Sequence, residues 1–292
     1  MTKNIPYYFI SAFKHEKKVW LFKKVLYAFL FLNTISMFPM VNDVFGYNGI
    51  AGSSGFRWYG VESFLNLLSH PVNYNRPYIA WFFVYGQLVA LGMGWFKIWP
   101  KLSGIAIYFF TVNLLSKGGL FFTGGEVLVS ILLFYLMFIQ ENKSNSVFQN
   151  ILNNTFYYII LIQICVLYYF STYFKLFDSN WTSGMALTYV SEIAFYSSDW
   201  FYSLVHQSEF FAKLATYSVL IYQALFPIVV WIKQIKIPFL TFGIILHLGI
   251  SFGMGIFSFG IIMIITYILF LDLSHIERLS RLFKFKKVTN HG

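Results

Sequence analysis

The sequence has a single cysteine, and few of its residues are charged. Cys165 lies inside an apolar run, so an intramolecular disulfide, a CxxC redox motif and a thiolate metal cluster are excluded. Charged residues make up 11% of the 292-residue chain and hydrophobic residues 58%, whereas an average soluble domain has about 25% and about 45–50%. The composition therefore excludes an ordinary soluble domain and predicts a polytopic membrane protein.

The amino-terminal region also lacks the features of a cleavable signal peptide. It is long and charged before the first apolar run, and no small-residue cleavage site follows that run promptly. We therefore expect the first apolar run to be an uncleaved span. The predicted spans lack the acidic residues that an ion-coupled transporter usually needs, and the sequence gives no sign of an inverted repeat, so a transporter is not favoured.

Eight apolar segments are candidate transmembrane spans. Several fall short of the roughly 20 residues that cross about 30 Å of hydrocarbon, which predicts that their helices extend into the adjacent turns and that the third continues through Lys117. The expected fold is all-α, a membrane bundle of about eight transmembrane helices. We expect a cytoplasmic segment at 1–19, a transmembrane domain at 20–273 and a basic cytoplasmic tail at 274–292. The eight segments are 25–41, 78–96, 102–115, 127–139, 156–174, 211–232, 237–252 and 256–271.

The positive charges are distributed unequally over the predicted connections. With a cytoplasmic start, 16 of the 21 Lys and Arg fall on the cytoplasmic side, as the positive-inside rule expects. Both termini are therefore predicted to be cytoplasmic. The tail "RLSRLFKFKK" needs only anionic membrane lipid as its partner, so nucleic acid is not an expected partner despite a pI near 9.4.

Two long connections are predicted on the outer side. The first, 42–77, contains Arg57, His70 and an amphipathic stretch at 61–68. The second, 175–210, offers a helix cap at Asp178, Ser179 or Asn180 ahead of a short segment near Trp181. Both are expected to be interfacial or re-entrant pieces that cover the outer mouth of the bundle.

Four stretches in order resemble one family. They are "SKGGLFFTGGEVLVSILLFYLMF" (116–138), "YYFSTYFKLFDSNWTSGMALTYV" (168–190), "LFPIVVWIKQIKIPF" (225–239) and "LHLGISFGMGIFSFG" (246–260). Together they are similar to the transmembrane region of the vitamin K-dependent gamma-carboxylases and of their bacterial relatives, the HTTM proteins. The resemblance extends over most of the chain from about residue 80 to 273.

The resemblance implies a catalytic role for Lys117. At this place in the pattern, the carboxylases have the lysine proposed to deprotonate reduced vitamin K, and an amine in a low-dielectric pocket without a close acid becomes available as a neutral base. The alternative is that Lys117 extends to the outer headgroups from the end of its span and complements the helix dipole. Many HTTM relatives have arginine there, which serves only as a cation.

His247 is the second catalytic candidate. It lies within an apolar segment beside Gly243, Gly249, Gly253 and Gly255, which predict close helix packing. An ionisable group at such depth is a functional hypothesis by default, and the resemblance places the matching histidine near the active chamber. We expect it to bond a quinol or a carboxylate rather than a metal. The alternative is a structural hydrogen bond to a carbonyl of a neighbouring span.

The remaining candidates are less specific. Glu126 follows Thr123 in a capping-box pattern, so helix capping is favoured over pairing with Lys117. Lys175 is either a helix-dipole complement or an outer-mouth cation for an acidic substrate, and Trp181 and Gly184 indicate an interfacial anchor and a close-packing turn. Binding of an anionic group by Arg57 and His70 is also considered. No metal site is predicted.

Three functions remain open. The first is a membrane enzyme that uses a reduced naphthoquinone of the vitamin K or menaquinol type, with a separate accessory subunit for its substrate. The second is a maturation or export factor for a small secreted peptide, similar to the SdpB-like proteins of sporulation-delaying toxin systems. The third is a non-catalytic membrane scaffold. Glutamate carboxylation itself is not among the three, because the sequence shows no counterpart of the large lumenal portion that recognises the peptide in the carboxylases. The expected location is the bacterial cytoplasmic membrane.

Overall fold

The computed structural model describes residues 7–45, 78–117, 123–140 and 146–282. The regular elements in these residues are all helical, as predicted. The chain packs as two units. Unit 1 comprises Met1–Lys23 with Gln140–Gly292, and unit 2 comprises Lys24–Ile139. The predicted amphipathic stretch at 61–68 lies outside the described residues, and the boundaries at 19 and 273 stay predictions.

Four helices are long and apolar enough to cross a membrane. Each of the eight predicted apolar segments coincides with a helix, and in the described residues these four have the length that a multi-pass protein needs. The four are α2 (Glu16–Ser36), α9 (Val147–Leu176), α13 (Glu209–Val229) and α14 (Lys236–Leu248), which continues as a π-helix over Gly249–Gly253. The shorter ones are α6 (Tyr78–Trp95), α7 (Pro100–Lys117), α8 (Gly124–Leu136) and α15 (Phe257–Thr266) with its 3-10 extension Tyr267–Phe270.

Unit 2 contains most of α2 together with α3 (Val41–Phe45), α6, α7 and α8. A short turn joins α6 to α7, so the two helices pack against each other along their length. Their interface is close because a Cβ atom at Gly86 would overlap the ring of Phe110. The apolar core of this unit consists of Val41, Val44, Phe45, Ala80, Phe83, Val84 and Leu114.

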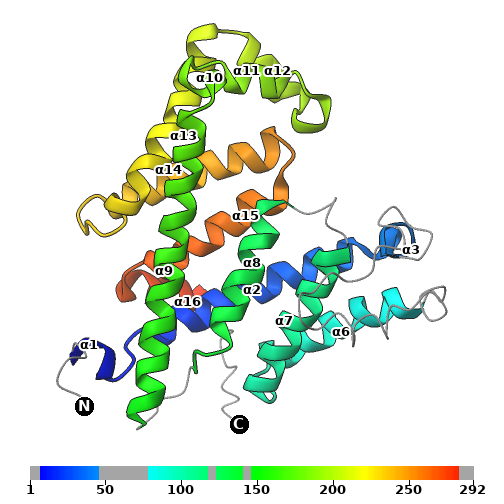
Figure 1. Cartoon of the computed structure of the whole chain (residues 1–292), viewed down its shortest axis with the longest axis vertical. Helices are drawn as coiled ribbons and strands as arrows, with labels where there is room; N and C mark the ends of the chain where they lie inside the picture. The colour runs from blue at the N-terminus through cyan, green and yellow to red at the C-terminus, as the bar shows by residue number, and fades with distance from the viewer. Residues whose placement is uncertain (1–6, 46–77, 118–122, 141–145, 283–292) are drawn as a thin grey trace, which may run out of the picture. The chain divides into compact units, whose positions relative to one another are not determined.

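Unit 1 is organised around α9 and α13, which pack against each other (Figure 1). Serine side chains cap both helices at their first turns, Ser146 accepting from the Gln149 amide and Ser208 from the Phe211 amide. Pro238 is tolerated in α14 because it lies in the first turn, where its missing N–H is not needed.

Three short helices gather at one end of α9 and α13 (Figure 1). They are α10 (Ser179–Thr182), α11 (Ala186–Ser191) and α12 (Asp199–His206). Asp178 caps α10 by accepting from the Asn180 amide at 2.8 Å, so the predicted cap is confirmed at the first of its three candidate residues. Leu187, Phe201, Val205 and Ala212 form a small apolar core between these helices and α13.

Candidate functional site

Lys117 is the last residue of α7, in unit 2. The helix therefore continues through Lys117 as predicted, although the lysine side chain lies outside what the structure describes. Glu126 is occupied by the predicted capping box, because its carboxylate accepts the Thr123 amide at 2.8 Å and the Thr123 hydroxyl at 2.5 Å. The prediction that Glu126 caps the start of α8 is thus confirmed.

His247 belongs to unit 1 and lies at the end of a buried chain of hydroxyl groups. His247 Nε2 is 2.8 Å from Tyr168 Oη, Tyr168 Oη is 2.8 Å from Tyr267 Oη, and Tyr222 Oη is 2.8 Å from Tyr267 Oη. We call these four residues the tyrosine–histidine cluster. Its members are at most 3% exposed. They come from α9, α13, α14 and the 3-10 turn after α15, so the cluster joins four helical elements.

One proton assignment of the cluster uses every hydroxyl proton and places the proton of His247 on Nδ1. Each tyrosine has one hydroxyl proton, and Tyr222 donates its proton to Tyr267. If Tyr267 then donates to Tyr168 and Tyr168 to His247, every hydroxyl proton is used. His247 accepts at Nε2 in this arrangement, so its own proton is on Nδ1. Nδ1 is buried and has no hydrogen-bond partner among the described residues, which leaves an unused donor inside the bundle.

Aromatic rings of α13 and α14 pack against the cluster. The ring of Phe226 stacks on Tyr168 with a centroid separation of 3.9 Å, and that of Phe239 stacks on Tyr222 at 4.5 Å. These rings exclude water from the hydroxyl chain, and hydrogen bonds strengthen in such a low-dielectric setting. The observed partner of His247 is a tyrosine hydroxyl of α9 rather than the main-chain carbonyl that the structural alternative proposed.

Glycine permits the close approach of the helices around His247, but only at some of the predicted positions. A Cβ atom at Gly243 would overlap Tyr222 Oη, and one at Gly253 would lie 2.9 Å from the Phe201 ring. A Cβ atom at Gly249 would have no neighbour within 4 Å, and at Gly255 it would meet only the Phe195 carbonyl at 3.8 Å. The expectation that all four glycines are packing contacts is therefore wrong for Gly249 and Gly255. Gly255 has φ +69°, so it serves a turn.

We expect Tyr168→Phe to lower the free energy of unfolding by about 1–3 kcal/mol, because it leaves buried His247 Nε2 without a partner. Denaturant titration of the purified protein in detergent measures this loss. Tyr169→Phe is the matched control, since Tyr169 is the next residue of α9 and is exposed. Equal stability of the two variants would contradict a stabilising role for the hydroxyl chain.

A second polar chain lies closer to the end of α9. Lys175 Nζ donates to Ser171 Oγ at 2.7 Å, and Ser171 Oγ donates to Gln223 Oε1 of α13 at 3.2 Å. The Lys175 ammonium also lies 4.9 Å from the centre of the Trp181 ring, a cation–π contact. Two of the four candidate residues of the predicted outer connections, Lys175 and Trp181, are therefore in contact.

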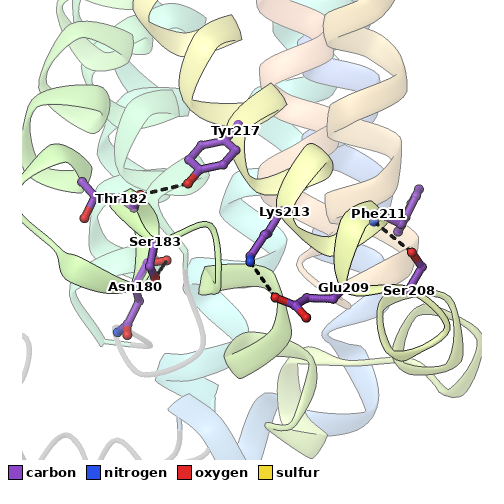
Figure 2. Close-up of polar contacts among 8 residues, drawn as sticks. All are labelled: Asn180, Thr182, Ser183, Ser208, Glu209, Phe211, Lys213 and Tyr217. Carbon is purple, nitrogen blue, oxygen red and sulfur yellow. Dashed lines mark hydrogen bonds and ion pairs between the residues drawn. The ribbon is translucent and has the colours of Figure 1, made fainter.

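One hydrogen bond joins α13 to α10, and an ion pair lies within the first turns of α13 (Figure 2). The hydroxyl of Tyr217 donates to the Thr182 carbonyl at 2.9 Å, and Lys213 pairs with Glu209 one turn away at 2.6 Å. Gly184 has φ +80°, and a Cβ atom there would lie 3.0 Å from the Lys213 side chain. The prediction of a close-packing turn at Gly184 is confirmed, because both its backbone conformation and its space favour glycine.

Within the described part of the chain, the structure brings together no other pair of the predicted site residues. Arg57 and His70 lie outside them. Lys117 and His247 belong to different units, so a shared pocket for these two residues stays a prediction.

Sequence reasoning missed Tyr168, Tyr222 and Tyr267. The chain has 21 tyrosines among many other aromatic residues, and nothing in their spacing distinguishes these three. The available signal was the combination of a histidine within one apolar span and tyrosines within others, because each polar group at that depth needs a partner.

Comparisons of this chain with protein families, with curated proteins and with solved structures found no significant match.

Proposed function

We propose that this chain is an HTTM-type protein of the bacterial cytoplasmic membrane that uses a reduced naphthoquinone to modify a small secreted peptide. The proposal includes about eight membrane helices with both termini in the cytoplasm, and an accessory subunit that shares recognition of the peptide. Two observations support it: the ordered motifs that resemble the HTTM family, and the four helices that are long and apolar enough to cross a membrane. The observation that carries it is His247 Nδ1, which is buried and has no hydrogen-bond partner in the part of the chain that the structure describes.

His247 fits a quinol oxygen in chemical terms. A buried donor without a partner costs free energy, and an oxygen of a bound hydroquinone or quinone would satisfy it. The tyrosines of the cluster hold the imidazole in the tautomer that has its proton on Nδ1, in the way that a hydrogen bond to one ring nitrogen sets the state of the other. His247 is then a binding and orienting group, and the tyrosines are positioning residues.

Lys117 is the proposed base. A reduced naphthoquinone, when bound, supplies an oxygen-consuming reaction that generates a base strong enough to remove a proton from carbon. The part of Lys117 is to accept the hydroxyl proton of the hydroquinone as a neutral amine, which general base catalysis requires. Lysine can lose its proton in an apolar setting, whereas arginine stays charged.

The end of unit 1 that bears α10–α12 is the proposed place for the peptide. Lys175, held against Trp181, offers a cation to an acidic side chain. α12 and the 3-10 turn before it (Ala194–Tyr196) expose the aromatic residues Phe195, Tyr196, Trp200 and Tyr202. This exposed surface also favours the second candidate, an SdpB-like factor that matures or exports a peptide, or a scaffold that holds one, without quinol chemistry.

A quinol assay tests the first candidate without knowledge of the peptide. Oxygenated membranes that contain the wild-type protein and a chemically reduced naphthoquinone are expected to form the quinone epoxide faster than empty-vector membranes. His247→Phe should raise the quinol concentration needed for half-maximal rate, because it removes the Nδ1 donor. His206→Phe on α12 is the matched control. Folded wild-type protein that forms no more epoxide than the vector would contradict the enzyme and favour the second candidate.

A further inference from the structure

A cavity of about 140 Å³ lies within unit 1, away from the tyrosine–histidine cluster. By the same measure, a single water needs about 10–15 Å³. The cavity therefore has room for a polar group of several heavy atoms. Its wall includes the side chains of Lys18, Lys236, Tyr157, Leu161, Trp231 and Phe270.

Two lysines give this cavity a positive charge in excess of its acids. Lys18 and Lys236 are only 9% and 7% exposed. Lys236 Nζ bonds Asp272 Oδ1 at 2.9 Å, and this bond to Lys236 holds the pKa of Asp272 below its usual value. Lys18 has no hydrogen bond or ion pair with any residue that the structure describes. Asp272 attracts Lys18 electrostatically but is already bonded to Lys236. Among the described residues the Lys18 ammonium is therefore nearly buried with no acid in direct contact, which is costly unless a further anion neutralises it.

The residues around the two lysines do not offset their positive charge. Burial, Lys18 and Lys14 lower the pKa of His15 to about 4, so His15 is neutral at physiological pH and stacks on Tyr157. Lys233 also acts on Asp272 from the turn before α14. A cationic ligand is thereby excluded, and an anionic ligand is the complement.

The two lysines also lie at the ends of helices where cations are least favourable. Lys18 is in the first turn of α2 and Lys236 is the first residue of α14. The amino terminus of a helix has a partial positive charge and binds anions such as phosphate. Lysines would weaken these helix ends unless an anion is bound between them.

The cavity combines this charge with an apolar wall at the end of two candidate membrane spans. α2 and α14 both begin at the cavity, and both are long and apolar enough to cross a membrane. Residues at the start of a span lie at the depth of lipid headgroups. Trp231, Phe270 and Leu161 provide the apolar surface that the first carbons of a lipid would contact. The charge distribution predicts that this end faces the cytoplasm, where the leaflet is rich in anionic lipid.

We propose that this cavity binds the phosphate of an anionic phospholipid, with Lys18 as the main ammonium partner and Lys236 as the second. Lys236 remains anchored by Asp272, and the phosphate neutralises Lys18. The lipid thereby joins the first turn of α2 to α14 and to the residues that follow the 3-10 turn Tyr267–Phe270. This inference does not depend on the proposed quinol chemistry.

Thermal unfolding of purified protein in neutral detergent, titrated with phosphatidylglycerol or phosphatidylcholine, tests the site. Phosphatidylglycerol is expected to raise the midpoint in a saturable way, and phosphatidylcholine is not. Lys18→Met should weaken the apparent affinity for phosphatidylglycerol about tenfold, the loss expected for one charged hydrogen bond. Lys17→Met is the matched control, because Lys17 is the adjacent residue, is largely exposed and pairs with Glu277.

Stability without lipid gives a second readout that separates binding from folding. Because Lys18→Met removes an unpartnered, nearly buried charge, this variant should unfold at the same or a higher temperature than the wild type in the absence of anionic lipid. A variant that is less stable both with and without lipid would overturn the proposal. Equal affinity of Lys18→Met and Lys17→Met for phosphatidylglycerol would also overturn it.

Titration with inorganic phosphate distinguishes a phospholipid from a soluble phosphate compound as the ligand of the cavity. Millimolar phosphate could raise the unfolding midpoint as much as phosphatidylglycerol does, with the rise lost in Lys18→Met. The ligand would then be a soluble phosphate compound, and the proposal of a lipid ligand would be overturned. Stabilisation by phosphatidylglycerol alone supports the lipid.

Discussion

Replacement of Lys117 by arginine is expected to lower the rate of naphthoquinol epoxidation by about 10²- to 10⁴-fold, the usual contribution of a general base. Arginine retains the positive charge at the end of α7 but does not lose its proton at physiological pH. The substitution therefore removes base chemistry and keeps any anchoring role. Chromatographic measurement of the epoxide in oxygenated membranes gives the rate.

The control for this experiment lies at the other end of the same helix. Lys101 is exposed in the first turn of α7, and Lys101→Arg is expected to leave the rate unchanged. An Lys117→Arg variant as active as the wild type would eliminate the base. Lys117 would then be a headgroup anchor, for which either cation is sufficient.

Gly260→Ala is expected to lower the free energy of unfolding by about 3 kcal/mol, the upper part of the range for overpacking. A Cβ atom there would overlap Ser251 Oγ and the main-chain carbonyl oxygen of His247. The second of these atoms is backbone, so it cannot move away by a change of rotamer. We expect α15 to be displaced from the end of α14, which would also disturb the hydrogen bond between His247 and Tyr168.

Gly249→Ala provides the matched control within the same pair of elements. A Cβ atom at Gly249 would have no neighbour within 4 Å, and alanine reduces the entropy lost on folding by about 0.5–1 kcal/mol. This variant should therefore be as stable as the wild type or slightly more stable. Denaturant titration in detergent measures both variants. An equal effect of the two substitutions would contradict the close approach of α15 to α14 at Gly260.

Features that depend on neighbouring residues in the chain were predicted well. The eight apolar segments are helical, α7 continues through Lys117, and Thr123 with Glu126 forms the expected capping box. Asp178 caps α10, and Gly184 has the positive φ of a turn. Each of these follows from local rules, namely apolar length, side-chain capping of free amides and the conformational freedom of glycine.

The catalytic roles that the resemblance to the HTTM family implies do not follow from local rules. They depend on the order of motifs along the chain, and they remain proposals that the Lys117→Arg and quinol experiments test. The structure adds the surroundings of His247. Its Nε2 bonds the Tyr168 hydroxyl, and its Nδ1 has no hydrogen-bond partner among the described residues.

The sequence by itself determined that this is an apolar, helical chain with few charges, and it predicted that the positive charges gather on one side of a membrane. Only the tertiary structure decided which polar side chains meet. Tyr168, Tyr222 and Tyr267 are separated by many residues, and they form one hydrogen-bonded chain that ends at His247 because α9, α13, α14 and α15 pack together. Lys18 and Lys236 likewise reach one cavity from two distant helix starts. The physical reason is that hydropathy and capping act over a few residues, whereas pairing of buried polar groups is set by how helices pack.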